Sequence, residues 1–152
     1  MEFFVYSRSK AKKMSYKFDK PTIIISITDP DKGLNAFAKN PNIMSVLRLQ
    51  FDDTDPDTLW GHEILMSKTD AEKIKQFVNA FKDKAECLIV HCEAGISRSA
   101  GVMAAIQKYL IGTDEDIFNR KKYSPNMHCY RLTLNALMDV PEGSAFGEIE
   151  TD

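Results

Sequence analysis

The chain has 152 residues, of which 43% are hydrophobic and 28% are charged, and its formal net charge is −2. This length fits one domain with a single core, and the apolar fraction excludes a chain that is disordered throughout. No run of about 18 apolar residues occurs, so we expect no membrane-spanning helix. The near-neutral charge offers no whole-chain basis for nucleic-acid binding.

The amino terminus does not resemble a secretory signal. Residues 1–6 are largely apolar, but the run is short and lacks a charged start and a cleavage site. The three cysteines, Cys87, Cys92 and Cys129, are an odd number, which argues against a disulfide framework. We therefore expect reduced thiols in a cytoplasmic protein.

Four short apolar runs have the character of β-strands, and helical patterns lie between them. The runs cover residues 3–6, 22–27, 45–51 and 87–91. The second run is rich in β-branched residues and is closed by the turn-forming residues 29–33. Strands that alternate with helices favour parallel pairing. The sequence predicts an α/β fold with a central, mostly parallel sheet of four to five strands flanked by helices.

The helical patterns begin after the third apolar run. Thr69 and Glu72 have the spacing of a capping box, which predicts a helix start there. The apolar stripe that follows consists of Ile74, Phe77, Val78 and Phe81. Residues 98–110 are apolar nearly all round, which is typical of a buried helix. We expect a short helix after Thr113 and a last one over about residues 126–138. Its inward residues should be Tyr130, Leu134 and Leu137.

One segment, residues 91–99, separates a predicted buried strand from a predicted buried helix. Gly95 lets the connecting loop turn tightly. Loop amides and a helix N-terminus together attract anions, and the guanidinium of Arg98 can bind two phosphate oxygens. Cys92 lies at the mouth of this positive site, which favours its thiolate, a nucleophile toward a bound phosphate. The hydroxyl of Ser99 is close enough in sequence to donate a hydrogen bond to that sulfur.

The segment His91–Ser99 has the sequence HCEAGISRS. It matches the signature of cysteine-dependent protein tyrosine phosphatases, in which His-Cys is followed by two residues, Gly, two residues, Arg and Ser or Thr. In size and loop content the chain resembles the compact dual-specificity branch. The resemblance implies a phosphatase-type fold and a phosphocysteine intermediate on Cys92. It also implies that Ser99 assists release of the thiolate, and that neither a metal nor a cofactor is needed. His91 is expected to orient the loop.

By the same resemblance, the loop itself binds the phosphoryl oxygens. The residues expected to do so are Glu93, Ala94, Gly95, Ile96, Ser97 and Arg98. The leaving oxygen also needs a proton, which in this family an aspartate from a separate loop supplies. The acidic stretch 52–57 follows the third strand and is the matching place. With Phe51 inward, the family pattern selects Asp53, while Asp52 and Asp55 stay open as alternatives.

The sequence thus predicts a phosphatase that acts on phosphotyrosine, with phosphoserine and phosphothreonine as further candidate substrates. The expected partner is a phosphorylated protein or peptide, without nucleic acid or membrane. One alternative is a phosphate-reading binding module that has lost catalysis. Another is an RNA 5′-phosphatase, although that activity needs a basic groove and four aspartates lie near the site.

Two further segments carry expectations. Residues 1–140 are expected to form the catalytic domain. Residues 141–152 are acidic and contain Pro141, Gly143 and Gly147, and we expect them to form a flexible tail.

Trp60 lies between the acidic stretch and the next helix. It either lines a substrate groove or anchors its loop on the core, and we expect the second, which is the more frequent role of a loop aromatic.

Overall fold

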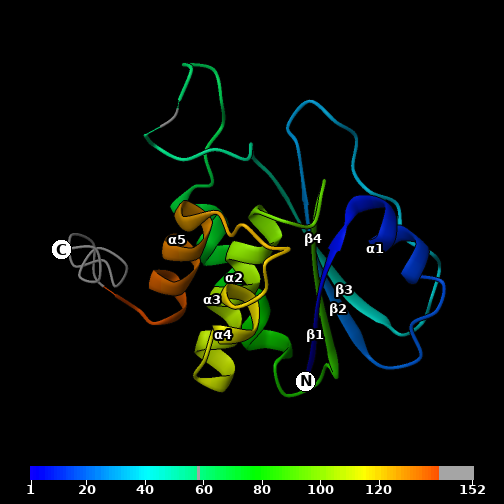
Figure 1. Ribbon diagram of the computed structural model, residues 1–152. Helices are drawn as coiled ribbons and strands as arrows, with labels where there is room; N and C mark the ends of the chain where they lie inside the picture. The colour runs from blue at the N-terminus through cyan, green and yellow to red at the C-terminus, as the bar shows by residue number, and fades with distance from the viewer. Residues whose placement is uncertain (58, 141–152) are drawn as a thin grey trace.

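The computed structural model describes residues 1–57 and 59–140, and within them it shows four strands and five helices (Figure 1). The strands are β1 (Glu2–Ser7), β2 (Thr22–Thr28), β3 (Ile43–Gln50) and β4 (Cys87–Cys92). The helices are α1 (Arg8–Met14), α2 (Lys68–Phe81), α3 (Arg98–Ile111), α4 (Glu115–Phe118) and α5 (Met127–Leu137). The predicted tail, residues 141–152, lies outside the described residues.

All four strands run parallel, in the order β1-β4-β2-β3. This confirms the predicted α/β fold with a parallel central sheet. Every residue of β2 and β4 is buried, because both strands lie inside the sheet and are covered on both faces. Burial on both faces explains why these two segments are nearly continuous apolar runs rather than alternating ones. The carboxyl ends of the strands meet at one edge, where β4 leads into the predicted phosphate site.

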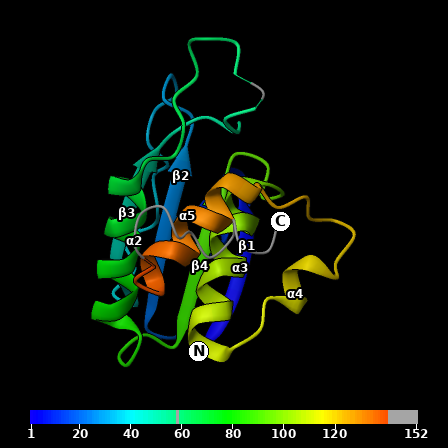
Figure 2. The same cartoon turned by 90° about the vertical axis from the view of Figure 1, so that its left-hand side faces the viewer.

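Helices cover both faces of the sheet. Figure 1 shows α1 on one face and α2, α3 and α5 on the other, and Figure 2 shows the face that these three helices cover. The larger part of the core lies between the sheet and these three helices, and it includes Ile25, Val90 and Ile106. A smaller cluster, with Ile24 and Ile89, packs under α1. Alternate residues of the inner strands therefore face two different helical layers, as the period of two residues in a strand requires.

Helix α2 begins two residues earlier than the sequence predicted. Its N-cap is Ser67, whose hydroxyl accepts a hydrogen bond from the N–H of Asp70, and the Asp70 carboxylate accepts one from the N–H of Ser67. The predicted capping box of Thr69 and Glu72 is therefore wrong. Both pairs have the required spacing, but the chain is already helical at Thr69, whereas Ser67 has the extended backbone that is typical of an N-cap residue.

The last helix confirms its predicted inward face. Tyr130, Leu134 and Leu137 of α5 are all buried, and α5 packs closely on α3. Gly101 of α3 makes this approach feasible, because a Cβ there would lie 2.4 Å from the carbonyl oxygen of Asn126. The close packing brings the start of α5 beside the start of α3, next to the loop that follows β4.

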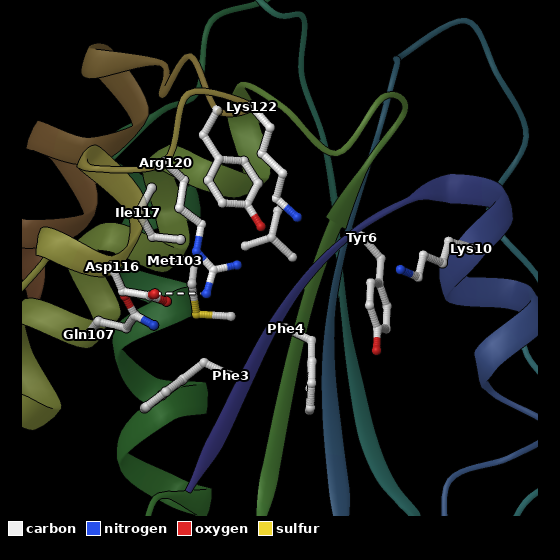
Figure 3. A pocket seen from close by; sticks show the side chains of 12 residues that line it. Phe3, Phe4, Tyr6, Lys10, Met103, Gln107, Asp116, Ile117, Arg120 and Lys122 are labelled. Atoms are coloured by element: carbon white, nitrogen blue, oxygen red, sulfur yellow. Dashed lines mark hydrogen bonds and ion pairs between the residues drawn. The ribbon is translucent and has the colours of Figure 1, made fainter.

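Strand β1 is an edge strand, paired only with β4 among the described residues. A groove of about 230 Å³ lies beside it, lined by β1 together with side chains of α1, α3, α4 and the segment after α4. Figure 3 shows these side chains. None of the residues predicted to carry chemistry lines this groove. Among residues 1–57 and 59–140, no helix combines the length and apolar character that crossing a bilayer requires.

Candidate active site

The loop between β4 and α3, which we call the phosphate loop (Cys92–Arg98), turns at Gly95. Gly95 has a φ of +72°, in the left-handed region that favours glycine. A Cβ at this position would lie 2.5 Å from the backbone nitrogen of Ser7. The loop is therefore packed directly against the end of β1, and its course depends on a residue without a side chain.

The sulfur of Cys92 lies inside this loop and is almost completely buried. Its Sγ lies 3.0 Å from Oγ of Ser99, and the N–H of Gly95 donates a hydrogen bond to it at 3.3 Å. Ser97 is the N-cap residue of α3, but its hydroxyl makes no capping hydrogen bond. The first turn of a helix has N–H groups without intrahelical partners. Here they remain available for an anion beside the sulfur.

The guanidinium of Arg98 is buried, with only 4% of the residue exposed. Its Nη1 donates to the carbonyl oxygen of Phe51 at 2.7 Å and pairs with Oδ1 of Asp29 at 2.7 Å. Its Nε is buried and has no hydrogen-bond partner among the described residues. A buried donor without a partner is costly, and an oxyanion in the loop is a ligand that could satisfy it. Sequence analysis placed Asp29 only in a turn.

The side chain of Glu93 is ion-paired. Its carboxylate lies 3.2 Å from Nη1 of Arg8 and accepts a hydrogen bond from the N–H of Asp29 at 3.3 Å. Lys32 lies 3.9 Å from the same carboxylate. The backbone carbonyl of Glu93 also accepts a hydrogen bond from the N–H of Arg8. These contacts tie the phosphate loop to the start of α1 and balance the negative charge of Glu93.

His91 is fully buried behind the loop. Its Nδ1 lies 3.2 Å from the carbonyl oxygen of Cys92, and its Nε2 lies 2.6 Å from Oγ of Ser26. A carbonyl can only accept, so the proton is assigned to Nδ1, and Nε2 accepts from the hydroxyl. Burial lowers the pKa of His91 to about 4. The ring is thus neutral near pH 7, and its geometry fits the predicted orienting role.

The three candidate acids make different contacts. Oδ1 of Asp53 accepts a hydrogen bond from the hydroxyl of Ser97 in the phosphate loop, at 2.7 Å. Asp52 instead accepts from the N–H of Ile64 at 2.7 Å, across the base of its own loop. Asp55 accepts from the N–H of Asp57 at 2.8 Å. Of the three, Asp53 is the one whose carboxylate is shown in contact with the phosphate loop.

Asn126 is a site residue that sequence analysis did not assign. Its Nδ2 donates to Asp53 Oδ1 at 3.0 Å and to the carbonyl oxygen of Thr54 at 3.0 Å. Its Oδ1 accepts from the N–H of Cys129 and so caps α5, while its own N–H donates to the carbonyl oxygen of Ser97. Through its side chain and its backbone N–H together, Asn126 therefore joins α5, Asp53 and the phosphate loop. The Pro-Asn pair before the helix was the available signal.

The described residues of the segment from Phe51 to Met66, which we call the acid loop, extend away from the body of the protein (Figure 1). Trp60 in this loop is 87% exposed, so the expectation that it anchors the loop on the core is wrong. The loop is held at its base instead, where Asp52 and Ile64 exchange two hydrogen bonds of 2.7 Å. Polar contacts at the base hold the loop without burying its aromatic tip.

The three cysteines are unpaired and buried. Burial raises the pKa of both Cys87 and Cys129, which makes them poor nucleophiles. In the described part of the chain, no three His, Cys, Asp or Glu side chains are grouped closely enough to hold a metal ion.

Comparison with solved structures finds similar folds. The human tyrosine phosphatase-like serine/threonine/tyrosine-interacting protein matches with a TM-score of 0.61 and 20% identity, over 99% of this chain and 93% of that one. A mouse putative dual specificity phosphatase complexed with zinc tungstate matches at 0.60 and 19%, over 91% and 83%. The Yvh1 phosphatase domain from Chaetomium thermophilum matches at 0.58 and 16%, over 93% and 94%. No family model and no curated protein matches the sequence.

These likenesses extend over nearly the whole chain, and at 20% identity or less they concern the fold. The chain therefore has the fold of the cysteine-dependent protein tyrosine phosphatases, in the compact form of their dual-specificity branch. The signature segment His91–Ser99 lies at the carboxyl end of a central strand, where open α/β sheets bind their ligands.

Proposed function

We propose that this protein is a cysteine-dependent phosphatase that removes phosphoryl groups from proteins through a phosphocysteine intermediate. The observation that carries the proposal is the buried sulfur of Cys92, 3.0 Å from the hydroxyl of Ser99, in the same loop as the unpartnered Nε of Arg98. A nucleophile and an unsatisfied cationic donor in one loop are what capture of a phosphate requires.

In the first step, the Cys92 thiolate attacks phosphorus, and the bond from phosphorus to the substrate oxygen breaks. Asp53 gives its proton to that leaving oxygen. In the second step, water attacks phosphorus, the S–P bond breaks, and Asp53 takes a proton from the water. Ser99 donates a hydrogen bond to the sulfur as it leaves as a thiolate. Inorganic phosphate is the product, and Cys92 and Asp53 are back in the protonation states from which they started.

Charge stabilisation in this mechanism comes from the protein chain alone. The nonbridging oxygens of phosphate carry the charge, and the uncapped start of α3 with the loop N–H groups from Glu93 to Arg98 would face them. The guanidinium of Arg98 would supply a charged donor. The proposal therefore needs no metal or cofactor. It does need Cys92 to stay reduced, so we place the reaction in a reducing compartment such as the cytoplasm.

The fold by itself does not separate hydrolysis from phosphate recognition, because one neighbour is named as an interacting protein. Three residues of this chain favour hydrolysis. Cys92 and Arg98 are both present in the loop, and the carboxylate of Asp53 reaches Ser97 of that loop. The aspartates of the acid loop near this site argue against an RNA substrate, whose phosphates would be repelled. A phosphorylated peptide, above all one with phosphotyrosine, remains the proposed substrate.

The test is turnover of an aryl phosphate by the purified full chain and by Cys92→Ser. We expect the variant to lose about 10⁴-fold or more of kcat, because its hydroxyl is a far weaker nucleophile. Cys87→Ser is the matched control, since Cys87 begins the same strand that Cys92 ends, and it should retain activity. Acid quenching of the wild type should trap phosphate on Cys92.

Turnover retained in Cys92→Ser would reject the mechanism. A wild type that binds vanadate but hydrolyses no aryl or peptide phosphate would favour the binding module instead. Paired peptides that differ only in phosphotyrosine, phosphoserine or phosphothreonine would then give the substrate preference of an active enzyme.

A further inference from the structure

The guanidinium of Arg98 is held on one side by groups from two other strands. Asp29 directly follows β2, and its Oδ1 lies 2.7 Å from Nη1 of Arg98. The carbonyl oxygen of Phe51, directly after β3, accepts from the same Nη1 at 2.7 Å. Both partners therefore bind the same nitrogen of the guanidinium, Nη1. A second nitrogen of the same group, Nε, has no hydrogen-bond partner among the described residues.

A planar guanidinium held at one nitrogen has few orientations left. Its fork binds an oxyanion best when two donors lie in the plane of two oxygens. An arginine side chain that is free to rotate loses conformational freedom when it binds. Contacts that fix it beforehand remove that cost and set the direction of the remaining donors.

We propose that Asp29 is a positioning residue, which holds Arg98 by the Nη1 contact so that its other donors face the phosphate loop. This inference rests on the proposed phosphatase function. Asp29 does not touch the reacting atoms in this role. It acts through Arg98, and the benefit should be greatest in the transition state, where the geometry around phosphorus is most demanding.

Asp29 is itself held in place by the same network. Its N–H donates to Glu93 at 3.3 Å, and its Oδ2 pairs with Lys32 at 3.2 Å. Burial disfavours the charged carboxylate, but the hydrogen bonds and charges of Arg98 and Lys32 outweigh it and lower the pKa of Asp29. Asp29 is thus ionised near pH 7 and bound between two cations, which limits its repulsion of an incoming phosphate.

The experiment compares Asp29→Ala and Asp29→Asn with the wild type, using an aryl phosphate as substrate and vanadate and inorganic phosphate as inhibitors. Vanadate mimics the five-coordinate transition state, and phosphate mimics the ground state. We expect Asp29→Ala to lose about 100-fold in kcat/KM, the scale of a misplaced catalytic group. Its vanadate affinity should fall by a similar factor, and its phosphate affinity by much less. Asp29→Asn keeps an acceptor and should recover part of the loss.

Asp31→Ala is the matched control, because it removes an exposed carboxylate two residues along the same loop. It should behave like the wild type. Thermal unfolding of each variant reports whether it folds, and Asp29→Asn keeps the test available if Asp29→Ala does not.

Three results would overturn the inference. Equal losses of vanadate and phosphate affinity would mean that Asp29 only maintains the folded loop. Tighter binding of both anions would mean that Asp29 acts only as a nearby negative charge. An active wild type with unchanged Asp29 variants would reject the role of Asp29 and leave the phosphatase proposal intact. A wild type that neither hydrolyses the substrate nor binds vanadate would reject the phosphatase proposal itself.

Discussion

The phosphate loop and the acid loop meet at one site but are built in opposite ways. The phosphate loop is seven consecutive residues, from the last residue of a buried strand to the first residue of a buried helix, and it is packed against β1 at Gly95. The acid loop is longer and more exposed, with Trp60 87% exposed. Backbone packing therefore sets the position of Cys92, the proposed nucleophile, whereas a few side-chain hydrogen bonds set that of Asp53, the proposed acid.

The two loops also differ in how far along the chain their contacts reach. The sulfur of Cys92 contacts Ser99 and Gly95, which lie within seven residues of it. Asp53 contacts Ser97 and Asn126, which lie 44 and 73 residues away. Because the phosphate loop is also packed against the backbone of β1, a mutation there should affect folding and chemistry together. A mutation of the acid should affect chemistry alone.

The largest effect should come from Gly95→Ala. The new Cβ would meet the Ser7 backbone at 2.5 Å and would impose the left-handed backbone on alanine. Strain and overpacking together should cost roughly 3 kcal/mol or more of the free energy of unfolding and abolish turnover. Urea unfolding and an aryl phosphate assay measure both quantities.

Gly112→Ala is the control, because Gly112 has a φ of +79° but open space around it. It should cost only about 1 kcal/mol and leave turnover unchanged. If both glycine variants lose the same stability and activity, the packing against β1 does not determine the conformation of the phosphate loop.

Asp53→Asn should lower kcat by about 10² to 10³-fold, the contribution of a general acid, with little change in stability. The pH–rate profile of the variant should lack the fall at high pH that a general acid produces. Asp55→Asn serves as control, because Asp55 contacts Asp57 within its own loop. The pH–rate profile decides the assignment, and a flattened profile in Asp55→Asn or Asp52→Asn would move it away from Asp53.

The pH dependence of stability tests the support behind the phosphate loop. Burial lowers the pKa of His91 to about 4 in the folded protein, against about 6.5 in an unfolded chain. Between these values only the unfolded chain takes up the proton, so stability is full above pH 6.5 and falls as the pH drops toward 4. The loss should reach roughly 3 kcal/mol.

His91→Asn keeps a donor for the carbonyl of Cys92 but does not titrate. Urea unfolding measured between pH 4 and 7 should show that the free energy of unfolding changes less steeply with pH in this variant than in the wild type. The same pH dependence of the free energy of unfolding in both proteins would mean that His91 does not cause the loss of stability at low pH.

The smallest effect should come from Trp60→Ala. Because Trp60 is 87% exposed, its loss should change the free energy of unfolding by less than about 0.5 kcal/mol. Phe51→Ala, at the fully buried start of the same loop, should cost roughly 3–5 kcal/mol. A large destabilisation by Trp60→Ala in urea unfolding would show that the tip of the acid loop packs on the body after all.

Much of the site could be predicted because its parts are contiguous. The inner strands β2 and β4 are buried on both faces, and such strands leave long apolar runs in a sequence. The segment His91–Ser99 keeps its pattern within nine residues, so Cys92, Ser99 and Arg98 could be named together. The α2 start was placed two residues late because two overlapping capping pairs occur, and only the backbone conformation at Ser67 distinguishes them.

The amino-acid sequence by itself determined the α/β class, the proposed nucleophile and the loop that surrounds it, because these depend on local periodicity and on neighbouring residues. Only the tertiary structure decided which acidic residue faces the loop, and that Asp29 and Asn126 belong to the site. The physical reason is that the partners of these residues are distant in the sequence. Those of Asp53 lie 44 and 73 residues away, and Asp29, which follows β2, pairs with Arg98 in the loop after β4. Such contacts arise where parallel strands end side by side, and no short stretch of sequence records that meeting.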